Sequence, residues 1–442
     1  MGIWWKRGHS ARTNLAWNRP VRFQTPAIML TGLSLALAAP AGAQEAGPES
    51  LQAAVDRRLR ESRADLIETR RDLHRHPEVS GREERTARIV SERLRALGLE
   101  VRTGVGGHGV VGMLRGGSPG PIVAFRADMD AVATTAPDPV EFASTVSGVR
   151  HICGHDIHTT VGLALAEGLA AVRSSLPGSI LFIFQPAEEN ATGARSMLAD
   201  SIFAGGKPDA IFAYHTAPLE VGQVGTKRGA LLPQRDRFQV ELWGAGDLSE
   251  SVDHAVATLD AQSSAARGAT SVVGDFAVTQ VWESGPGDRA DSWVIRGSVT
   301  TTGPHVSEQV RTEIRKGLEE LRTGGIQYRL DYETRFTAGV TNDPELEAES
   351  RTPLRSVLGD NGLVELESVP TQFSEDFGSF QEQVPGVMYY LGVSNAEKGW
   401  VGLPHSPGYV ADEESIEIGA RAMAAVILDY LKSSHAHQGS VP

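Results

Sequence analysis

The chain has 442 residues, of which 40% are hydrophobic and 22% are charged, and its formal net charge is -13 at pH 7. These values are typical of a globular protein with room for two domains or one large one. The negative charge argues against nucleic acid and anionic membranes as partners.

Residues 1–43 have the pattern of a secretory signal. A basic start precedes the apolar run 27–39, and the small residues Ala41-Gly42-Ala43 form a cleavage pattern before Gln44. The apolar run is too short to span a bilayer comfortably. We therefore expect an exported protein, periplasmic or secreted, with no membrane span after processing. An uncleaved anchor or a wrongly assigned start is the alternative.

Segments with helical and strand periodicity alternate through most of the remaining chain. The pattern predicts helices over 51–74, 83–97, 159–172 and 415–431, and strands over 110–114, 122–125, 180–184, 210–214 and 387–391. This alternation predicts an α/β fold with a sheet whose faces are covered. Several strands lead into polar residues, and in open α/β sheets ligands lie beyond the carboxyl ends of the strands. We therefore expect one site shared by these strand ends.

The character of the sequence changes between residues 233 and 341. Segments 237–243, 293–299 and 327–332 read as half-exposed strands, and 249–265 and 307–322 read as helices. The segment is predicted to be an inserted α+β domain. The catalytic domain would then be discontinuous, with parts at 44–232 and 342–434, and residues 435–442 would form a flexible tail.

The single cysteine, Cys153, lies two positions before His155. A thiolate and an imidazole at that spacing can bind one soft divalent metal ion. An exported protein with one cysteine cannot form an internal disulfide, so Cys153 is either buried and inert or a metal ligand. We interpret it as a ligand because of its histidine neighbours.

A hydrolytic site with two metal ions needs several ligands on stiff elements and a base that deprotonates water. Cys153 and His155 are expected in one loop before the helix that starts near Thr159. The adjacent glutamates diverge, so we assign Glu189 to the metal and Glu188 to the general base. A solvated acidic turn is the alternative for this pair. The candidate ligands are Cys153, His155, Glu189, His215 and His405.

Six segments together resemble the aminoacylase/carboxypeptidase metallopeptidase family, and within it the N-acyl-amino-acid amidohydrolases such as hippurate hydrolase and auxin-conjugate hydrolases. The resemblance implies a two-metal α/β catalytic domain and an inserted lid that also dimerises. It places the ligand and base roles on the same residues. The segments are Asp72-Leu73-His74-Arg75-His76-Pro77-Glu78, Phe125-Arg126-Ala127-Asp128-Met129-Asp130-Ala131, Cys153-Gly154-His155-Asp156, Phe184-Gln185-Pro186-Ala187-Glu188-Glu189, Ser374-Glu375-Asp376-Phe377 and His405-Ser406-Pro407.

Four more carboxylates are candidates for orienting the ligands from behind, as metal sites usually require. They are Asp128, Asp130, Asp156 and Glu375. Capping of the following loop is an equal alternative for the first two. The mixed ligand set favours zinc, and manganese or cobalt can also occupy such sites. The expected cofactors are therefore two divalent metal ions.

The insertion departs from the family pattern. Related lids begin with a Gly-Gly-His-Ala type segment, whose histidine reaches the substrate across the dimer, whereas Asp247 occupies this region here. An ionised aspartate cannot donate a hydrogen bond to an oxyanion and repels a carboxylate. We therefore expect an unusual substrate, and spacing does not favour His254 or His305 as substitutes.

The first hypothesis is an exported amidohydrolase that cleaves an N-acyl amino acid or a related small amide. A dipeptidase or carboxypeptidase of the same scaffold is the second, although Cys153 at the metal argues against it, because the family's peptidases tend to have an aspartate-based bridge. A metal-binding protein with a catalytically inactive lid is the third. A homodimer through the insertion is expected from the resemblance.

Overall fold

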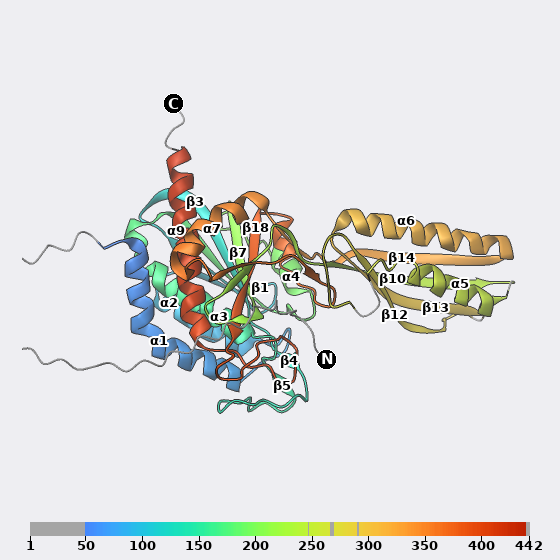
Figure 1. Cartoon of the computed structure of the whole chain (residues 1–442), viewed down its shortest axis with the longest axis horizontal. Coiled ribbons are helices and arrows are strands. Elements are labelled where there is room, and N and C mark those ends of the chain that lie inside the picture. Colours follow the sequence, from blue (N-terminus) through green and yellow to red (C-terminus); the bar gives the residue numbers. More distant parts are fainter. Residues whose placement is uncertain (1–48, 246, 266–268, 290, 439–442) are drawn as a thin grey trace, which may run out of the picture. The chain divides into compact units, whose positions relative to one another are not determined.

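The computed structural model describes residues 49–438 apart from 246, 266–268 and 290. The expected signal, residues 1–43, lies outside the described residues. A mixed sheet of eight strands, in the order β1-β2-β6-β3-β7-β18-β8-β16, forms the scaffold (Figure 1). Its strands are β1 (Glu100–Val105), β2 (Gly109–Arg115), β3 (Ser118–Asp128), β6 (Pro177–Gln185), β7 (Ala210–Glu220), β8 (Val224–Thr226), β16 (Leu363–Glu365) and β18 (Gly386–Ser394).

The four central strands β6, β3, β7 and β18 are parallel, so their carboxyl ends meet at one edge of the sheet. The outer neighbours β1, β2 and β8 join this group through antiparallel pairs. This arrangement allows the segments after β3 and β6 to approach one another.

Helices cover both faces of this sheet. Val123 and Phe125 of β3 belong to the larger core with α1, α2, α3, α7 and α9, whereas Ala124 faces the smaller core with α4 and α8. Alternate residues of a strand point to opposite faces, so burial on both sides explains the continuous apolar runs. The predicted α/β fold with a covered mixed sheet is confirmed. The helices are α1 (Leu51–Arg75), α2 (Glu84–Ala96), α3 (His155–Ala170), α4 (Gly193–Ala199), α7 (Pro344–Leu358), α8 (Gly378–Gln381) and α9 (Glu414–Gln438).

A second, antiparallel sheet has the strand order β12-β13-β10-β14. Two helices pack on it, and Phe238, Leu259, Ile295 and Ile314 lie in a core of its own. The sequence analysis missed β12, an edge strand whose Trp282 side chain is exposed. The elements are β10 (Gln234–Gly244), α5 (Leu248–Asp260), β12 (Ala277–Pro286), β13 (Ser292–Thr301), α6 (Pro304–Glu320) and β14 (Ile326–Thr337).

Short elements complete the described chain. Of three two-stranded sheets, one flanks a loop and the other two join segments that are far apart in sequence. They are β4 (Val132–Ala133) with β5 (Val149–Arg150), β9 (Gly229–Leu232) with β15 (Val340–Asn342), and β11 (Ser271–Val272) with β17 (Val369–Pro370), and the 3-10 turns are Arg173–Ser175 and Leu321–Gly324.

Three boundaries differ from the sequence-based expectation in ways that bear on the site. Helix α3 begins at His155 rather than near Thr159, so His155 lies in the first helical turn. Strand β7 continues to Glu220, so His215 lies inside the strand rather than after it. Helix α9 continues to Gln438, into the segment expected to be a flexible tail. None of the described helices combines the length and apolar character needed to cross a membrane.

Candidate metal centre

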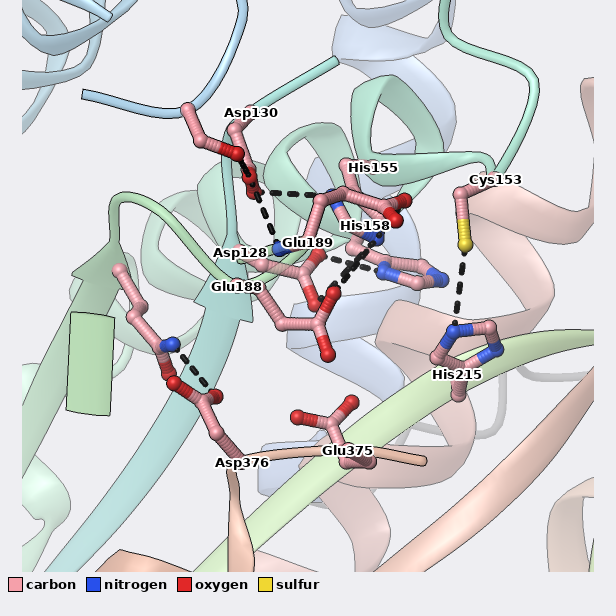
Figure 2. Close-up of polar contacts among 12 residues, drawn as sticks. Asp128, Asp130, Cys153, His155, His158, Glu188, Glu189, His215, Glu375 and Asp376 are labelled. Atoms are coloured by element: carbon pink, nitrogen blue, oxygen red, sulfur yellow. Dashed lines mark hydrogen bonds and ion pairs between the residues drawn. The ribbon is translucent and has the colours of Figure 1, made fainter. Parts of the chain in front are cut away.

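The five proposed ligands come from four separate parts of the fold and meet in one cluster. The ligand atoms of Cys153, His155 and His215 all lie within 4.8 Å of one another. Those of Cys153, Glu189 and His405 meet the same limit. Cys153 Sγ lies 3.5 Å from His215 Nε2, and Figure 2 shows the two side chains pointing toward each other. The thiol is therefore next to the imidazoles, as the hypothesis requires.

The backbone around Cys153 is shaped by a glycine and by the segment that carries His405. Gly154 has a φ of 93°, and a Cβ at this position would lie 2.1 Å from the hydroxyl oxygen of Tyr409. Only glycine adopts this conformation readily and leaves room for such an approach. The His405 backbone N–H donates to Ile152 O at 3.0 Å, which fixes the distant C-terminal segment beside Cys153.

Several ligand atoms are buried and free to accept a cation. In the neutral form that a metal ion binds, His155 Nδ1 donates to Asp130 Oδ1 at 3.2 Å and His155 Nε2 is the nitrogen left for the metal. This Nε2 lies 3.7 Å from Glu189 Oε1, and neither atom has a hydrogen-bond partner among the residues that the structure describes. His215 Nδ1 donates to Thr216 O at 2.8 Å, so its Nε2 is likewise free to face Cys153.

The charges in the cluster also fit a cation. Burial and then the facing Glu375 and Glu189 carboxylates raise the pKa of Glu188 well above its usual range. Burial and then the Glu189 and Glu188 carboxylates raise the pKa of the Cys153 thiol well above its usual range. Burial lowers the pKa of His155, but the nearby aspartates outweigh it and raise the value to about 10. Such an excess of negative charge is what bound divalent cations neutralise, and thiolate, imidazole and carboxylate together suit zinc-like metals. The residues present therefore fit a metal centre.

The two adjacent glutamates have partly different neighbours, although one carboxylate oxygen of each lies within 4.8 Å of the other and of a His155 ring nitrogen. Glu189 Oε1 lies 3.4 Å from His405 Nε2, on the side of the other proposed ligands. The Glu188 carboxylate lies close to those of Glu375 and Asp376 (Figure 2). One oxygen of each of the three lies within 4.8 Å of the other two. Its Oε2 remains 3.8 Å from His155 Nε2. Glu188 is thus next to the cluster without being surrounded by its ligands.

Asp130 contacts two of the proposed ligands directly. Its Oδ1 holds His155, and its Oδ2 accepts hydrogen bonds from the Glu189 backbone N–H at 3.0 Å and the Ser80 hydroxyl at 2.6 Å. Asp128 bonds to His158 Nδ1 at 2.6 Å and lies 3.7 Å from His155 Nε2. Asp130 therefore lies where a group that orients the ligands is needed, whereas Asp128 holds His158 and faces the Nε2 of His155 that is left for the metal.

Asp156 and His158 have other partners. Asp156 Oδ2 accepts from His74 Nδ1 at 2.7 Å and pairs with Arg70 Nε at 2.9 Å, so Asp156 attaches α3 to α1 instead of reaching a proposed ligand. His158 Nδ1 donates to Asp128, and its Nε2 accepts from the Thr216 backbone N–H at 2.7 Å. Both ring nitrogens of His158 are therefore used, and it has none left for a metal.

Sequence reasoning missed Arg126, which lies at the centre of the acidic group. This fully buried guanidinium contacts Asp128 at 2.7 Å, Glu375 at 2.8 Å and Asp376 at 3.3 Å. The signal available in the sequence was a charged residue at the end of the apolar run 122–125. Glu375 therefore faces both Arg126 and Glu188, which gives it a place beside the proposed base.

A second missed residue is Glu83. Its Oε1 accepts hydrogen bonds from the backbone N–H groups of Ala187 and Gly81, both at 2.8 Å. Ala187 has a φ of 55°, a conformation that residues other than glycine rarely adopt. Glu83 thus holds the turn that aims Glu188, and no local pattern in the sequence indicates this contact.

Asp247 and the two histidines of the insertion have partners within the insertion. The Asp247 side chain accepts the Glu250 N–H at 3.0 Å and caps α5. His254 Nε2 contacts Gly317 O within the insertion, and His305 contacts Gln309 one turn along α6. Capping explains an aspartate at this position, since its oxygen satisfies a free helical N–H group.

Comparison with known proteins places the chain in a family. A model of the peptidase family M20/M25/M40 matches residues 124–429, which is more than half of the chain. The chain belongs to this family. It is therefore a hydrolase that acts on amide bonds, in agreement with the resemblance stated from its motifs.

Two curated relatives of this M20 hydrolase match over most of their length. It is 32% identical over 385 residues to thermostable carboxypeptidase 2 of Saccharolobus solfataricus, covering 83% of this chain and 95% of the relative. It is 31% identical over 393 residues to N-acetylcysteine deacetylase of Bacillus subtilis, covering 83% and 98%. A solved Bacillus subtilis structure, described as a dinuclear metal binding peptidase from the M20 family, matches with a TM-score of 0.73 and 28% identity, over 84% of this chain and 99% of that one.

Proposed function

We propose that this M20 hydrolase cleaves the amide bond of an N-acyl amino acid or a related small amide. Two divalent ions would be held by the five ligands, with Glu188 as general base. The convergence of the five side chains, with the Glu188 carboxylate beside them, carries this proposal. The similarity to an N-acetylcysteine deacetylase and to an IAA-amino acid hydrolase of Arabidopsis thaliana, 29% identical over 391 residues, supports the substrate class.

The residues of the chain divide the work between binding and proton transfer. Divalent ions held by these five residues would supply Lewis acidity toward the amide carbonyl. Glu188 takes a proton from the attacking water and returns it to the leaving nitrogen. The buried position that raises the pKa of Glu188 suits a proton carrier, because efficient transfer needs a carboxyl that binds its proton readily near the working pH. Glu83 fixes the turn that carries Glu188 by accepting a hydrogen bond from the Ala187 backbone N–H.

The metal is proposed to be zinc, with manganese or cobalt as the other candidates. A thiolate and imidazoles favour zinc, whereas the added carboxylate admits the harder ions. Metal analysis of the purified protein, followed by reloading of the chelated protein with each ion, measures which one restores hydrolysis.

The decisive variant is Glu188→Gln, which keeps the size of the side chain and removes the base. We expect kcat to fall by about 10²–10⁴-fold, the usual contribution of a general base, with the bound metal retained. Glu92→Gln, at an exposed position of α2, is the matched control and should leave kcat unchanged. Full hydrolysis by Glu188→Gln would refute the assigned role.

The second candidate is a carboxypeptidase or dipeptidase activity, which the similarity to thermostable carboxypeptidase 2 favours. Parallel assays on a panel of N-acyl amino acids and a panel of short peptides separate the two substrate classes. Faster turnover of the peptides would replace the first candidate by the second. Family membership counts against the third reading, a metal-binding protein without catalysis.

Export and dimerisation are further parts of the proposal. The pattern of residues 1–43 supports export, and N-terminal sequencing of protein recovered from outside the cytoplasm should begin at Gln44. Within the described insertion, β12 and β14 are the edge strands of the sheet, and such edges can pair with a second copy. Sedimentation of the purified protein should then give twice the mass of the processed chain.

A further inference from the structure

His74, near the end of α1, lies between two carboxylates from different parts of the fold. Its Nδ1 lies 2.7 Å from Asp156 Oδ2, and its Nε2 lies 3.1 Å from Asp138 Oδ2. Burial raises the pKa of each carboxyl group, but the facing donors outweigh burial and lower both values, so both groups are ionised at neutral pH. A carboxylate accepts hydrogen bonds and cannot donate them. Both contacts are therefore satisfied only when both ring nitrogens of His74 carry a proton.

Asp138 belongs to the loop 134–148, which joins β4 to β5. Within this loop, Asp138 Oδ2 accepts the Ser144 backbone N–H at 2.9 Å, and Asp138 Oδ1 pairs with Arg150 Nε of β5 at 3.1 Å. The Phe142 ring of the same loop lies edge-on to the His74 ring, with the two centroids 5.3 Å apart. The loop thus packs on the end of α1 around His74.

The two carboxylates differ in how easily they can lose this partner. Asp156 is fully buried, and its Oδ1 has no hydrogen-bond partner among the residues that the structure describes. Asp138 lies in the loop, where 11% of its side chain is exposed. A neutral imidazole has one N–H group and can donate to only one of the two carboxylates. Water can hydrate Asp138 but not Asp156, so a neutral His74 keeps Asp156 and releases Asp138.

The other charged groups around His74 do not cancel this effect. Burial lowers the pKa of His74 and Arg70 lowers it further, but the two facing carboxylates outweigh both and raise it. Glu413 pairs with Arg70 at 3.4 Å and so offsets its charge. His151 is neutral, because burial lowers its pKa to about 4. The titratable and charged groups that face His74 or its partners are Arg70 and Arg71 of α1, Asp138 and Glu141 of the loop, Arg150 of β5, Asp156 of α3, and His151 and Glu413.

We propose that His74 is a pH-sensitive latch, whose protonated ring ties the loop 134–148 to the start of α3 and whose neutral ring releases the loop. The latch reaches the proposed metal centre through Arg150, which pairs with Asp138 and donates to Pro407 O at 3.3 Å, two positions after His405. Release of the loop therefore frees an arginine that holds the segment of His405. The effect on the centre rests on the proposed ligand role of His405, whereas the latch itself does not.

Hydrogen–deuterium exchange on the metal-loaded protein tests the latch, because exchange of the amides in 134–148 reports local opening of this loop. Rates are measured from pH 6 to pH 9 and divided by the intrinsic exchange rate of an unfolded peptide at each pH. Protection of the loop in the parent protein should fall by about tenfold to a hundredfold over this range, the change expected for loss of one charge-assisted hydrogen bond.

Two variants change the latch from opposite sides. His74→Gln removes the imidazolium and should leave the loop weakly protected at every pH. Asp138→Asn should make protection of the loop independent of pH, because an amide can accept from the imidazole or donate to it. Since Asp138 lies outside the helices and strands, the second variant tests the latch even if His74→Gln does not fold. His76→Gln is the matched control, because the His76 ring contacts Asp72, and it should behave as the parent does.

The proposal is overturned if the corrected protection of the loop in the parent is the same at pH 6 and pH 9. It is also overturned if His74→Gln and Asp138→Asn keep the pH dependence of the parent. A fall in protection that extends equally to α3 and β3 counts against it as well, because that result indicates general loosening and not release of one loop. No substrate is present in the measurement, so its result is independent of the role of Glu188.

Discussion

Replacement of Arg126 by methionine tests the buried charge network behind the proposed base. The variant keeps most of the side-chain volume but leaves Asp128 and Glu375 in the interior without their counter-charge. Burial and the like charge of Glu375 raise the pKa of Asp376 above its usual range, and the opposing charge of Arg126 lowers it in part. Removal of one partner from a buried ion pair costs about 3–5 kcal/mol.

This cost converts into a measurable change in melting temperature. The entropy of unfolding is roughly 2.1 cal/mol/K per residue, or about 0.8 kcal/mol/K for the ~390 described residues, so the midpoint should fall by about 4–6 °C. Differential scanning calorimetry on the protein as purified is the assay. Arg88→Met is the control, because Arg88 pairs with Glu92 on the surface with both side chains more than half exposed. Its midpoint should change by less than about 1 °C.

The double variant Arg126→Met/Glu375→Gln separates charge from packing. Neutralisation of Glu375 removes one of the uncompensated charges, so we expect the double variant to recover at least about 1 kcal/mol relative to Arg126→Met. If Arg126→Met melts together with the Arg88→Met control, the network contributes no net stability and the reasoning is refuted. A double variant less stable than Arg126→Met would show that packing, and not charge, dominates.

Three other predictions follow from single contacts. Asp130→Asn should weaken metal binding by about 10–100-fold in chelator competition, because Asp130 holds His155, and unchanged affinity would contradict that role. Gly154→Ala should lower both metal content and thermal stability, since its Cβ would lie 2.1 Å from the Tyr409 hydroxyl, and a parent-like protein would show that this segment can shift. Burial lowers the pKa of His74, but the facing carboxylates outweigh burial and raise the pKa above the usual 6.5. The contribution of protonated His74 to the free energy of unfolding is therefore complete below pH 6.5 and is lost as the pH rises through the raised value. The difference in melting temperature between the parent and His74→Gln should therefore shrink from pH 6 to pH 9, and a difference that grows would have the wrong sign.

Much of the main sheet could be predicted because its strands are apolar on both faces. Each predicted strand lies inside an observed one, for example 122–125 within β3 and 387–391 within β18. The ends were missed because a backbone ladder continues through polar residues, as at Asp128 and His215. Strand β12 was missed for a different reason: one of its faces is largely open, and an edge strand shows little apolar alternation.

The proposed ligands could be found from local motifs, since each lies in a short segment whose neighbouring residues single it out. Their supporting contacts could not be found in this way. The pairing of Asp156 with Arg70 and His74 depends on how α1 packs against α3, some 80 residues away in sequence. Arg126 contacts Glu375, which lies 249 positions later in the chain, and no local pattern indicates this pair. Such partners depend on tertiary packing, which periodicity does not encode.

The attachment of His405 to the segment around Cys153 has a consequence for biosynthesis. At 5–20 residues per second, a ribosome needs roughly 13–50 s to extend the nascent chain from position 153 to position 405. Throughout that interval the thiol exists without the imidazole that arrives last. With His405 as a ligand, as proposed, a full complement of metal could be acquired only after nearly the whole polypeptide has been translated, and a message truncated before this codon would yield a protein unable to complete the proposed centre.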